Sequence, residues 1–472
     1  MQAHPDLADE QAAVEHAYRC LAAMRERTAA AVAIGESAAQ AVDSAIATAH
    51  LTRRLRTLDP DVDGLAFGRL DHETGERWYV GRRHVEDQAG DPVVVDWRAG
   101  VSAPFYRATA ADPLDLSRRR RFVMTGRRLD DLFDEVFDDP DSVHAARHGG
   151  IPDPLLAELE RSRTGEMRDI VATIAAEQDV VIRADLGTCL VVQGGPGTGK
   201  TAVGLHRAAF LLYEHREQLD REGVLVIGPN PVFLRYISQV LPSLGEAATR
   251  QTTMLALVGR RARATDTVER ARLLGDGRLA TVLDRACRLQ LRPPADDVAV
   301  ATGFGRVVLP VADVAAAMEE IAARDVPHAV GRRALRTRLQ RLAVQRHPRG
   351  RDDGSTGLEL EAAVRNSADL AAAVGRLWPN LSGPALVRRV LTSPRALAAA
   401  AAGVLTAGEQ RRLLRKGGAK LADEPWTPAE QVLIDEAEAL VNGVAQSYGH
   451  VVVDEAQDLS AMELRALARR CP

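Results

Sequence analysis

One short segment constrains the fold of this chain more than any other, a glycine-rich loop at residues 194–201. It reads GGPGTGKT, with the apolar run TCLVVQ before it and an amphipathic run after it. A glycine-rich loop between a strand and a helix is typical of a phosphate-binding loop. Its glycines let backbone N–H groups wrap the phosphates at the positive end of the helix. We therefore predict that a nucleotide is bound by eight residues, Gly194, Gly195, Pro196, Gly197, Thr198, Gly199, Lys200 and Thr201.

Side chains at and near this loop have predicted chemical roles. Lys200 is expected to reach the β and γ phosphates, and the hydroxyl of Thr201 to ligate Mg²⁺. A metal at such a loop also needs a carboxylate from a neighbouring strand, which the sequence VVVDE at residues 451–455 offers at the end of an apolar run. We expect Asp454 to hold Mg²⁺ through water, and Glu455 to polarise the attacking water as a catalytic carboxylate.

The segments around the loop predict an α/β fold. A helix is expected over residues 199–219, and a second apolar strand, VLVIG, over residues 224–228. The run HVVV before Asp454 predicts a third apolar strand, with a helix after it. Strands that are apolar throughout are typical of a parallel sheet covered on both faces. The predicted core is therefore a parallel sheet that carries the phosphate loop, with residues 188–193 as one of its strands.

The chain before this core divides into a helical part and a β-rich part. Residues 7–58 contain no proline and repeat apolar residues at three- and four-residue spacing, which predicts two antiparallel helices with a tip near Gly35. This hairpin either packs on the body of the protein or protrudes into a partner. After Pro60, short strands are predicted at residues 65–72, 77–83, 92–99 and 103–110.

The charged side chains of the β-rich part favour a structural interpretation. The run from Arg118 to Arg121 is more typical of a solvated face or of internal ion pairs than of a contact to nucleic acid. A net charge of -4 gives no global field that would attract nucleic acid, and aromatic residues at 4% leave few platforms for base stacking. Asp96, Trp97 and Arg98 have no predicted chemical role beyond a buried structural pair between their strand and its neighbour.

A long stretch separates Lys200 from Asp454, so a large insertion is expected between the two halves of the core. Helical patterning is predicted over residues 154–178 before the loop, and over most of residues 253–442. A β-hairpin at residues 298–309 and a polar loop at residues 349–357 are the expected exceptions.

Composition limits the cellular setting. No apolar run approaches the roughly 18 residues that a membrane span needs, and the first residues lack a secretory signal, so the cytoplasm is the expected location. Four scattered cysteines without a Cys-x-x-Cys pair argue against a disulfide framework and against a zinc site.

The two motifs resemble those of a known superfamily. DEAQD at residues 454–458 is similar to motif II of the UvrD/Rep-type superfamily 1 helicases, and GGPGTGKT is similar to their motif I. The resemblance implies a RecA-like core in which Gln178 recognises adenine, so that ATP and Mg²⁺ are the implied cofactors. It also implies that Gln457 senses the γ-phosphate and couples it to movement. Gln457 thus joins Lys200 and Glu455 as a catalytic candidate.

Flanking sequence resembles the HelD/HelR group of bacterial helicase-like motor ATPases over nearly the whole chain. The segments that carry this resemblance are YVGRRHVED, VVVDWRAGVSAPFYRAT, GPNPVFLRYISQVLPSLGE and WTPAEQVLIDEAEAL. It implies an ATPase that releases or recycles stalled or inhibitor-bound RNA polymerase. The N-terminal hairpin would enter the secondary channel of the polymerase core, and residues 349–357 or the helices at residues 385–416 would enter its main channel.

The predicted parts follow from this resemblance. They are a helical hairpin at 1–60, a small β-rich unit at 61–150, the two halves of one RecA-like domain at 151–257 and 446–472, and a helical insertion at 258–445. Superfamily 1 motors have two RecA-like domains, whereas this chain stops at Pro472, soon after Asp458. We therefore expect a fragment or a truncated frame, with weak hydrolysis because the cationic groups of a second domain are missing.

Two other functions stay open. A UvrD/Rep-type helicase that moves on single-stranded DNA would show ATPase activity stimulated by that DNA, and binding that falls steeply with salt. A non-hydrolysing module would bind ATP or polymerase without useful turnover, and its partner binding would survive Lys200→Ala. Glu455→Gln separates the motors from the module, because it should keep ATP affinity and abolish turnover in either motor.

Overall fold

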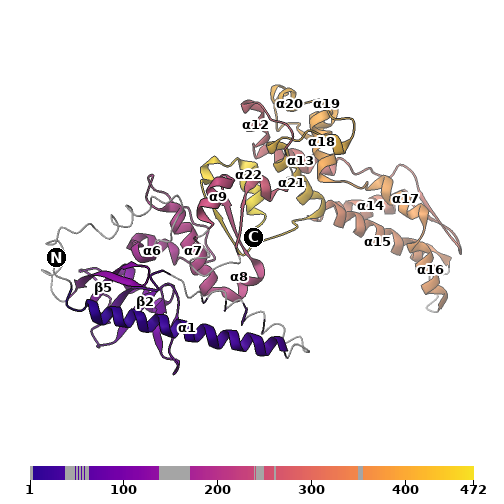
Figure 1. Cartoon of the computed structure of the whole chain (residues 1–472). Helices are drawn as coiled ribbons and strands as arrows, with labels where there is room; N and C mark the ends of the chain where they lie inside the picture. The colour runs from indigo at the N-terminus through magenta and orange to yellow at the C-terminus, as the bar shows by residue number, and fades with distance from the viewer. Residues whose placement is uncertain are drawn as a thin grey trace. The chain divides into compact units, whose positions relative to one another are not determined.

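The computed structural model describes residues 4–37, 48, 51, 52, 55, 58, 63–137, 171–238, 240, 249–259, 262–348 and 355–471. Over these ranges the chain is α/β, as predicted, and forms two compact units (Figure 1). The first unit comprises Met1–Thr253 and Gly449–Asp454, and the second comprises Met254–Tyr448 and Glu455–Pro472. No helix among the described residues is long and apolar enough to span a membrane.

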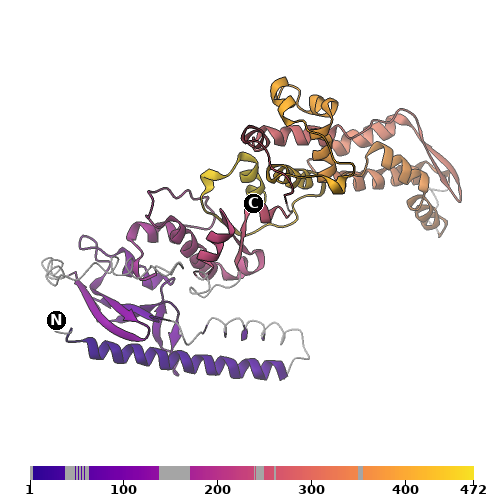
Figure 2. The same ribbon diagram turned by 45° about the horizontal axis from the view of Figure 1, so that its top comes forward.

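The first unit begins with α1 (Leu7–Ser37), a single helix of 31 residues that Figure 2 shows as one continuous rod. Its N-terminal half buries Val14, Leu21 and Met24 against the neighbouring sheet. α1 ends at Ser37, two residues beyond the tip predicted near Gly35, so the first helix of the predicted hairpin is confirmed. The second helix predicted for the hairpin lies largely outside the described residues.

A six-stranded sheet packs on α1, in the order β3-β4-β2-β1-β5-β6. Strand β1 pairs antiparallel with β2 and with β5. The pairs β5–β6 and β3–β4 are also antiparallel, whereas β2 and β4 are parallel. The bounds are β1 (Ala66–His72), β2 (Arg77–Gly81), β3 (Val85–Glu86), β4 (Pro92–Asp96), β5 (Leu116–Thr125) and β6 (Arg128–Val136). Three of the four strands predicted before residue 110 are therefore confirmed.

The fourth predicted strand, at residues 103–110, is wrong. The chain there forms a 3₁₀ turn, η1 (Gly100–Ser102), and a short helix, α3 (Pro104–Arg107). Proline suits the first turn of a helix, because it has no N–H to leave unpaired and its φ is already helical. Phe105 and Tyr106 are both buried, and they reach the core from this short helix.

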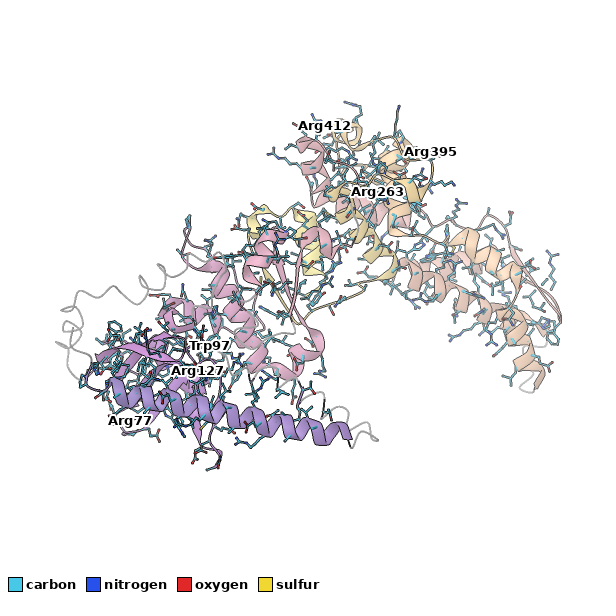
Figure 3. All side chains as sticks on the ribbon, viewed as in Figure 1. Arg77, Trp97, Arg127, Arg263, Arg395 and Arg412 are labelled. Atoms are coloured by element: carbon cyan, nitrogen blue, oxygen red, sulfur yellow. The ribbon has the colours of Figure 1, made fainter. Side chains whose placement is uncertain are left out.

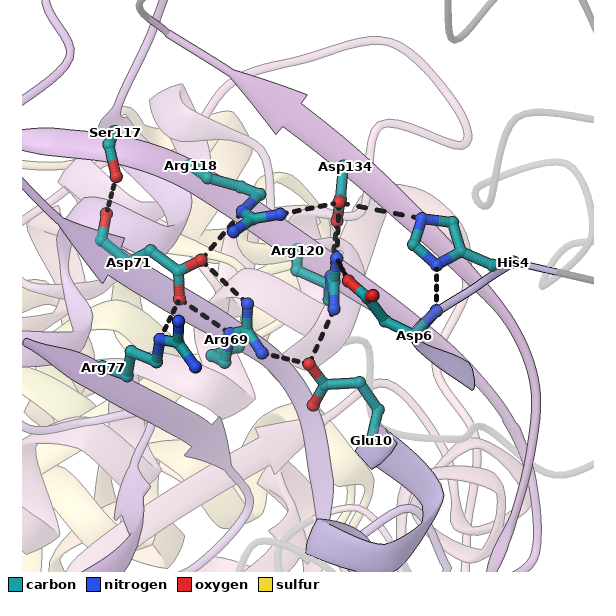
Figure 4. Close-up of polar contacts among 10 residues, drawn as sticks. All are labelled: His4, Asp6, Glu10, Arg69, Asp71, Arg77, Ser117, Arg118, Arg120 and Asp134. Atoms are coloured by element: carbon teal, nitrogen blue, oxygen red, sulfur yellow. Dashed lines mark hydrogen bonds and ion pairs between the residues drawn. The ribbon is translucent and has the colours of Figure 1, made fainter. Parts of the chain in front are cut away.

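The arginine run lies in β5 and makes internal ion pairs, as one of the two structural interpretations predicted (Figure 4). Arg118 binds Asp71 at 2.8 Å. Arg120 is 1% exposed and is surrounded by three carboxylates, with contacts of 2.6 Å to Asp6, 2.7 Å to Glu10 and 2.6 Å to Asp134. These arginines therefore tie α1 to the sheet.

A three-stranded parallel sheet forms the remaining core of the first unit, in the order β11-β7-β8. The predicted strands are found as β7 (Val224–Gly228) and β11 (His450–Val453). The helix expected over residues 199–219 is found as α7 (Lys200–Glu214) and α8 (Arg216–Glu222). The edge strand β8 (Thr249–Thr253) was not predicted, because TRQTT carries no apolar run.

One expected strand of this sheet is missing. Residues 188–193 are irregular, and Val191 is 81% exposed. An apolar run alone does not form a strand, because the backbone of a strand also needs hydrogen-bonding partners on a neighbouring strand. Among the described strands, none pairs with residues 188–193.

Shorter helices complete the first unit. Before the loop lie η2 (Val171–Thr173) and α6 (Ala176–Ile182), and after β7 lies α9 (Pro231–Ile237). The helix predicted at residues 154–178 falls mainly outside the described residues. A continuous apolar core joins α3, α6 and α7 to both sheets, with Trp97, Phe105 and Leu211 fully buried in it.

The second unit is mainly helical with one hairpin, as predicted. Its strands β9 (Val298–Thr302) and β10 (Gly305–Leu309) pair antiparallel. The elements are α11 (Met254–Leu257), α12 (Val268–Leu274), α13 (Arg278–Arg288), α14 (Val311–Ala322), α15 (His328–Arg346), α16 (Ser355–Arg365), α17 (Ala368–Leu377), α18 (Gly383–Thr392), α19 (Pro394–Ala400), α20 (Ala407–Leu413), η4 (Leu421–Asp423), α21 (Pro428–Asn442), η5 (Ala456–Asp458) and α22 (Ala461–Ala468). The loop predicted at 349–357 lies outside the described residues except for its last part, which opens α16.

Candidate functional site

The glycine-rich loop leads directly into α7, as its sequence predicts. Gly197 and Gly199 have φ values of +79° and +81°, a left-handed backbone that other residues rarely adopt. Gly199 is the N-cap of α7, so the first N–H groups of a 15-residue helix point into the loop. Such free N–H groups and the positive end of the helix dipole are suited to binding an anion.

Lys200 stands over this loop. Its Nζ donates hydrogen bonds to the carbonyl oxygens of Gly194 and Gly195, each at 2.9 Å. Thr198 closes the loop from the other side, because its hydroxyl donates to Gly195 O at 2.9 Å. The ammonium therefore lies where the loop backbone curls, the position from which a lysine reaches phosphate oxygens.

Thr201 and Asp454 meet although they are far apart in the sequence. The hydroxyl of Thr201 donates to Asp454 Oδ2 at 2.9 Å. Asp454 follows β11, which pairs with β7, and Asp454 N donates to Ile227 O at 3.0 Å. A hydroxyl and a carboxylate side by side are hard oxygen donors of the type that Mg²⁺ prefers, so this pair fits the predicted metal site.

Gln178 lies against the phosphate loop. Its Nε2 donates to Thr198 O at 3.1 Å, while its Oε1 accepts from Ala175 N at 3.0 Å. A Cβ atom at Gly199 would lie 3.0 Å from Gln178 Nε2, so any larger residue there would displace this amide slightly from the loop. The structure thus brings Gln178 to the loop, while its role in adenine recognition stays a prediction.

Glu455 caps η5 and Gln457 lies within it, and both belong to the second unit. Both are exposed, and Gln457 Nε2 donates to Glu455 Oε2. Glu455 has a φ of +51°, an unusual left-handed conformation for a residue with a side chain. Such strain is often found at functional sites, so it is consistent with the catalytic role predicted for Glu455.

Three charged residues near the loop were not predicted. Asp179 and Arg183 on and just after α6 form an ion pair at 2.8 Å, and Asp179 is fully buried. Arg207 of α7 is also buried, and desolvation lowers the pKa of its guanidinium. The spacing of Asp179 and Arg183 by four residues, typical of ion pairs along a helix, was the signal available in the sequence.

Two further features lie away from the loop. A surface hollow of about 770 Å³ is lined by residues of α1 and of the turn before β6, among them His4, Leu7 and Arg127. His4, Asp6 and Asp134 are close enough to share a metal ion (Figure 4), but Arg120 already neutralises both carboxylates. Neither feature adds a ligand to the phosphate-loop site.

The fold and this site define an α/β protein with a candidate nucleotide site. Residues 7–148 match the protein family described as DNA helicase IV HelD, N-terminal domain. The match spans α1 and the six-stranded sheet, and it supports a HelD-like helicase family with a helicase-related function. The resemblance to HelD is thereby confirmed over these residues, while the assignment to the UvrD/Rep superfamily stays a prediction. No curated protein matches the chain.

Proposed function

We propose that this protein is a HelD-type motor ATPase that binds ATP and Mg²⁺ at the phosphate loop and acts on RNA polymerase. The observation that carries the nucleotide site is the hydrogen bond from Thr201 to Asp454, which joins the loop to a carboxylate from a distant segment. The family match at residues 7–148 supports the motor class. A RecA-like core, in which residues 446–472 complete the sheet begun at 151–257, is part of this proposal.

Each residue of the site has a proposed task. Lys200 and the N–H groups at the start of α7 would bind the phosphates, and Gln178 would bind the adenine base. Thr201 and Asp454 would hold Mg²⁺, which supplies charge neutralisation for phosphoryl transfer when bound. Glu455 would orient and polarise the attacking water, and Gln457, which contacts Glu455, would report the γ-phosphate.

Turnover is tested with Glu455→Gln. We expect this variant to bind ATP like the wild type and to lose phosphate release by at least 100-fold, since a positioned general base contributes about 10²–10⁴-fold. Asp423→Asn, which changes an exposed carboxylate outside the motif at 454–458, is the matched control and should keep most of the activity. Equal losses in the two variants would contradict the role of Glu455, and a wild type that binds ATP without turnover would favour the non-hydrolysing module.

The partner is tested without deleting α1. Its N-terminal half supplies buried side chains such as Val14 and Leu21, so removal of residues 1–60 would damage the core of the unit. We expect Ala29→Glu together with Ala30→Glu, two exposed positions in the distal half of α1, to weaken binding to core RNA polymerase. The matched control is Ala110→Glu with Ala111→Glu on an exposed turn of the same unit.

The DNA helicase alternative is retained because the matching family is described as DNA helicase IV. It predicts ATPase stimulation by single-stranded DNA and a steep loss of binding with salt. Gel filtration of the wild type with core polymerase and with single-stranded DNA separates the two functions. Co-elution with DNA alone would favour the helicase.

A further inference from the structure

The helix α6 connects the phosphate loop to the six-stranded sheet of strands β1–β6, called the N-terminal sheet below. Gln178 on its first turn contacts the loop through Thr198 O. The next residue, Asp179, points into the protein and is fully buried. Any shift or rotation of this seven-residue helix therefore moves the amide of Gln178 relative to the loop.

A clamp of charged groups holds α6 against the N-terminal sheet. The carboxylate of Asp179 accepts from Arg107 Nε of α3 at 2.5 Å and from Arg183 Nε at 2.8 Å. Arg183 also donates to Trp97 O at 2.6 Å and to Arg98 O at 2.8 Å, just after β4. A buried carboxylate needs such partners, because leaving its negative charge unpaired costs several kcal/mol.

The same loop after β4 contacts the helix that follows the phosphate loop. Trp97, labelled in Figure 3, packs edge-on against His206 of α7 with ring centroids 5.7 Å apart. Arg98 lies 4.8 Å above the ring of Tyr213, and its guanidinium pairs with the buried Asp96 at 2.7 Å. A buried pair is thus found, but it joins Asp96 to Arg98 within one segment rather than the strand to its neighbour, and it supports a contact to α7.

The C-terminal end of α6 is held from α7 as well. Arg207 donates to the carbonyl oxygens of Ala184 and Asp185, the latter at 2.8 Å. These carbonyls follow a helix end, where backbone acceptors lack partners inside the helix. The middle of α6 is thereby fixed through Asp179, and its C-terminal end is fixed through Arg183 and Arg207.

We propose that Asp179 and Arg183 are positioning residues that hold Gln178 at the phosphate loop and so set the base selectivity of the nucleotide site. The inference rests on the proposed function, because it assumes that a nucleotide binds there. It adds that the N-terminal sheet, through the carbonyls of Trp97 and Arg98, determines how well the site distinguishes adenine from guanine.

The test compares ATP and GTP affinities of the full chain by titration calorimetry in the presence of Mg²⁺. Arg183→Lys keeps a positive charge beside Asp179 but loses the planar fork that binds the backbone carbonyls. We expect its ATP-to-GTP affinity ratio to fall at least threefold, and that of Gln178→Ala at least tenfold. The variant with both changes should fall no further than Gln178→Ala alone, because both act through the same amide.

Controls separate positioning from general damage. Arg221→Ala, on the exposed side of α8, should leave the ratio unchanged. Arg107→Lys weakens the ion pair of Asp179 with the half-exposed Arg107 and should also lower the ATP-to-GTP affinity ratio. This variant replaces Arg183→Lys if that protein does not fold. Equal losses of ATP and GTP affinity, or effects of Arg183→Lys and Gln178→Ala that multiply, would overturn the inference. A wild type that binds neither nucleotide would instead overturn the proposed function, and this inference with it.

Discussion

At the residue scale, His450 shows how burial sets a pH dependence. Desolvation, with a further contribution from the charge of Arg207, lowers the pKa of His450 to about 4. Its unfolded value is about 6.5, so the folded state disfavours the protonated imidazole. The free energy of unfolding is therefore unaffected above pH 7 and falls by up to roughly 3 kcal/mol as the pH drops from about 6.5 to about 4.

His450→Gln tests this dependence. The variant cannot protonate at this position, so its urea midpoint should fall less than that of the wild type between pH 7 and pH 4.5. Other groups contribute to acid unfolding in both proteins, and the difference between them isolates the histidine. Parallel losses in the two proteins would mean that His450 is protonated equally well in the folded and unfolded states.

Arg120 is the centre of the ion-pair network in the first unit (Figure 4). It is 1% exposed, and Glu10, one of its three carboxylate partners, is 2% exposed. Arg120→Ala should lower the free energy of unfolding by about 3 kcal/mol, because of the two described cations paired with the buried Glu10 it leaves only Arg69. Arg128→Ala is the control, since the Arg128 side chain is 76% exposed and forms its ion pair with Asp130 near the surface.

The two arginine variants are compared by urea unfolding followed through tryptophan fluorescence. An exposed ion pair contributes roughly 0–1 kcal/mol, so Arg128→Ala should change the midpoint little. If both variants unfold at the same urea concentration, the network around Arg120 does not stabilise the unit as described.

At the element scale, two glycines in neighbouring helices of the second unit have opposite environments. A Cβ atom at Gly331 in α15 would lie 2.5 Å from the ring of Trp378, whereas one at Gly375 in α17 would have no atom within 4 Å. We expect Gly331→Ala to lower the free energy of unfolding by about 1–3 kcal/mol through overpacking. Gly375→Ala should raise it by about 0.5–1 kcal/mol, because alanine favours a helix.

Thermal unfolding of the two glycine variants provides the comparison. The expected order of midpoints is Gly331→Ala below the wild type, and the wild type below Gly375→Ala. A Gly331→Ala protein as stable as Gly375→Ala would show that Trp378 moves aside at little cost.

The elements also show which features the sequence makes predictable. VLVIG and HVVV became β7 and β11, because a continuous apolar run of that length is suited to a buried parallel strand. TCLVVQ has the same character, yet residues 188–193 are irregular, because pairing depends on neighbours that no local pattern encodes. The strand β8 was missed for the opposite reason, since its polar sequence pairs with β7 only through the tertiary fold.

The candidate site was predictable to a similar degree. Spacing and residue type identified Lys200, Thr201 and Asp454, and the contact of Thr201 with Asp454 agrees with that prediction. The clamp around Asp179 was not predicted, because burial of a charged side chain depends on partners from α3 and from the loop after β4. Those partners are brought together only by folding.

At the scale of the whole molecule, the phosphate-loop sheet is completed by a segment from the far end of the described chain. β11 and Asp454 belong to the first unit, although the residues between β8 and β11 form the second unit. The candidate site therefore depends on a contact of very high sequence separation, which is slow to form during folding. A local change in either half of the sheet is expected to affect the site.

The most direct test is the binding of ATP to the full chain by titration calorimetry, with and without Mg²⁺. We predict binding that Mg²⁺ strengthens, that Lys200→Ala weakens at least tenfold, and that Asp454→Asn makes less dependent on Mg²⁺. A wild type that binds no ATP, or a Lys200→Ala variant that binds as tightly as the wild type, would contradict the assignment of the glycine-rich loop and Asp454 as a nucleotide site.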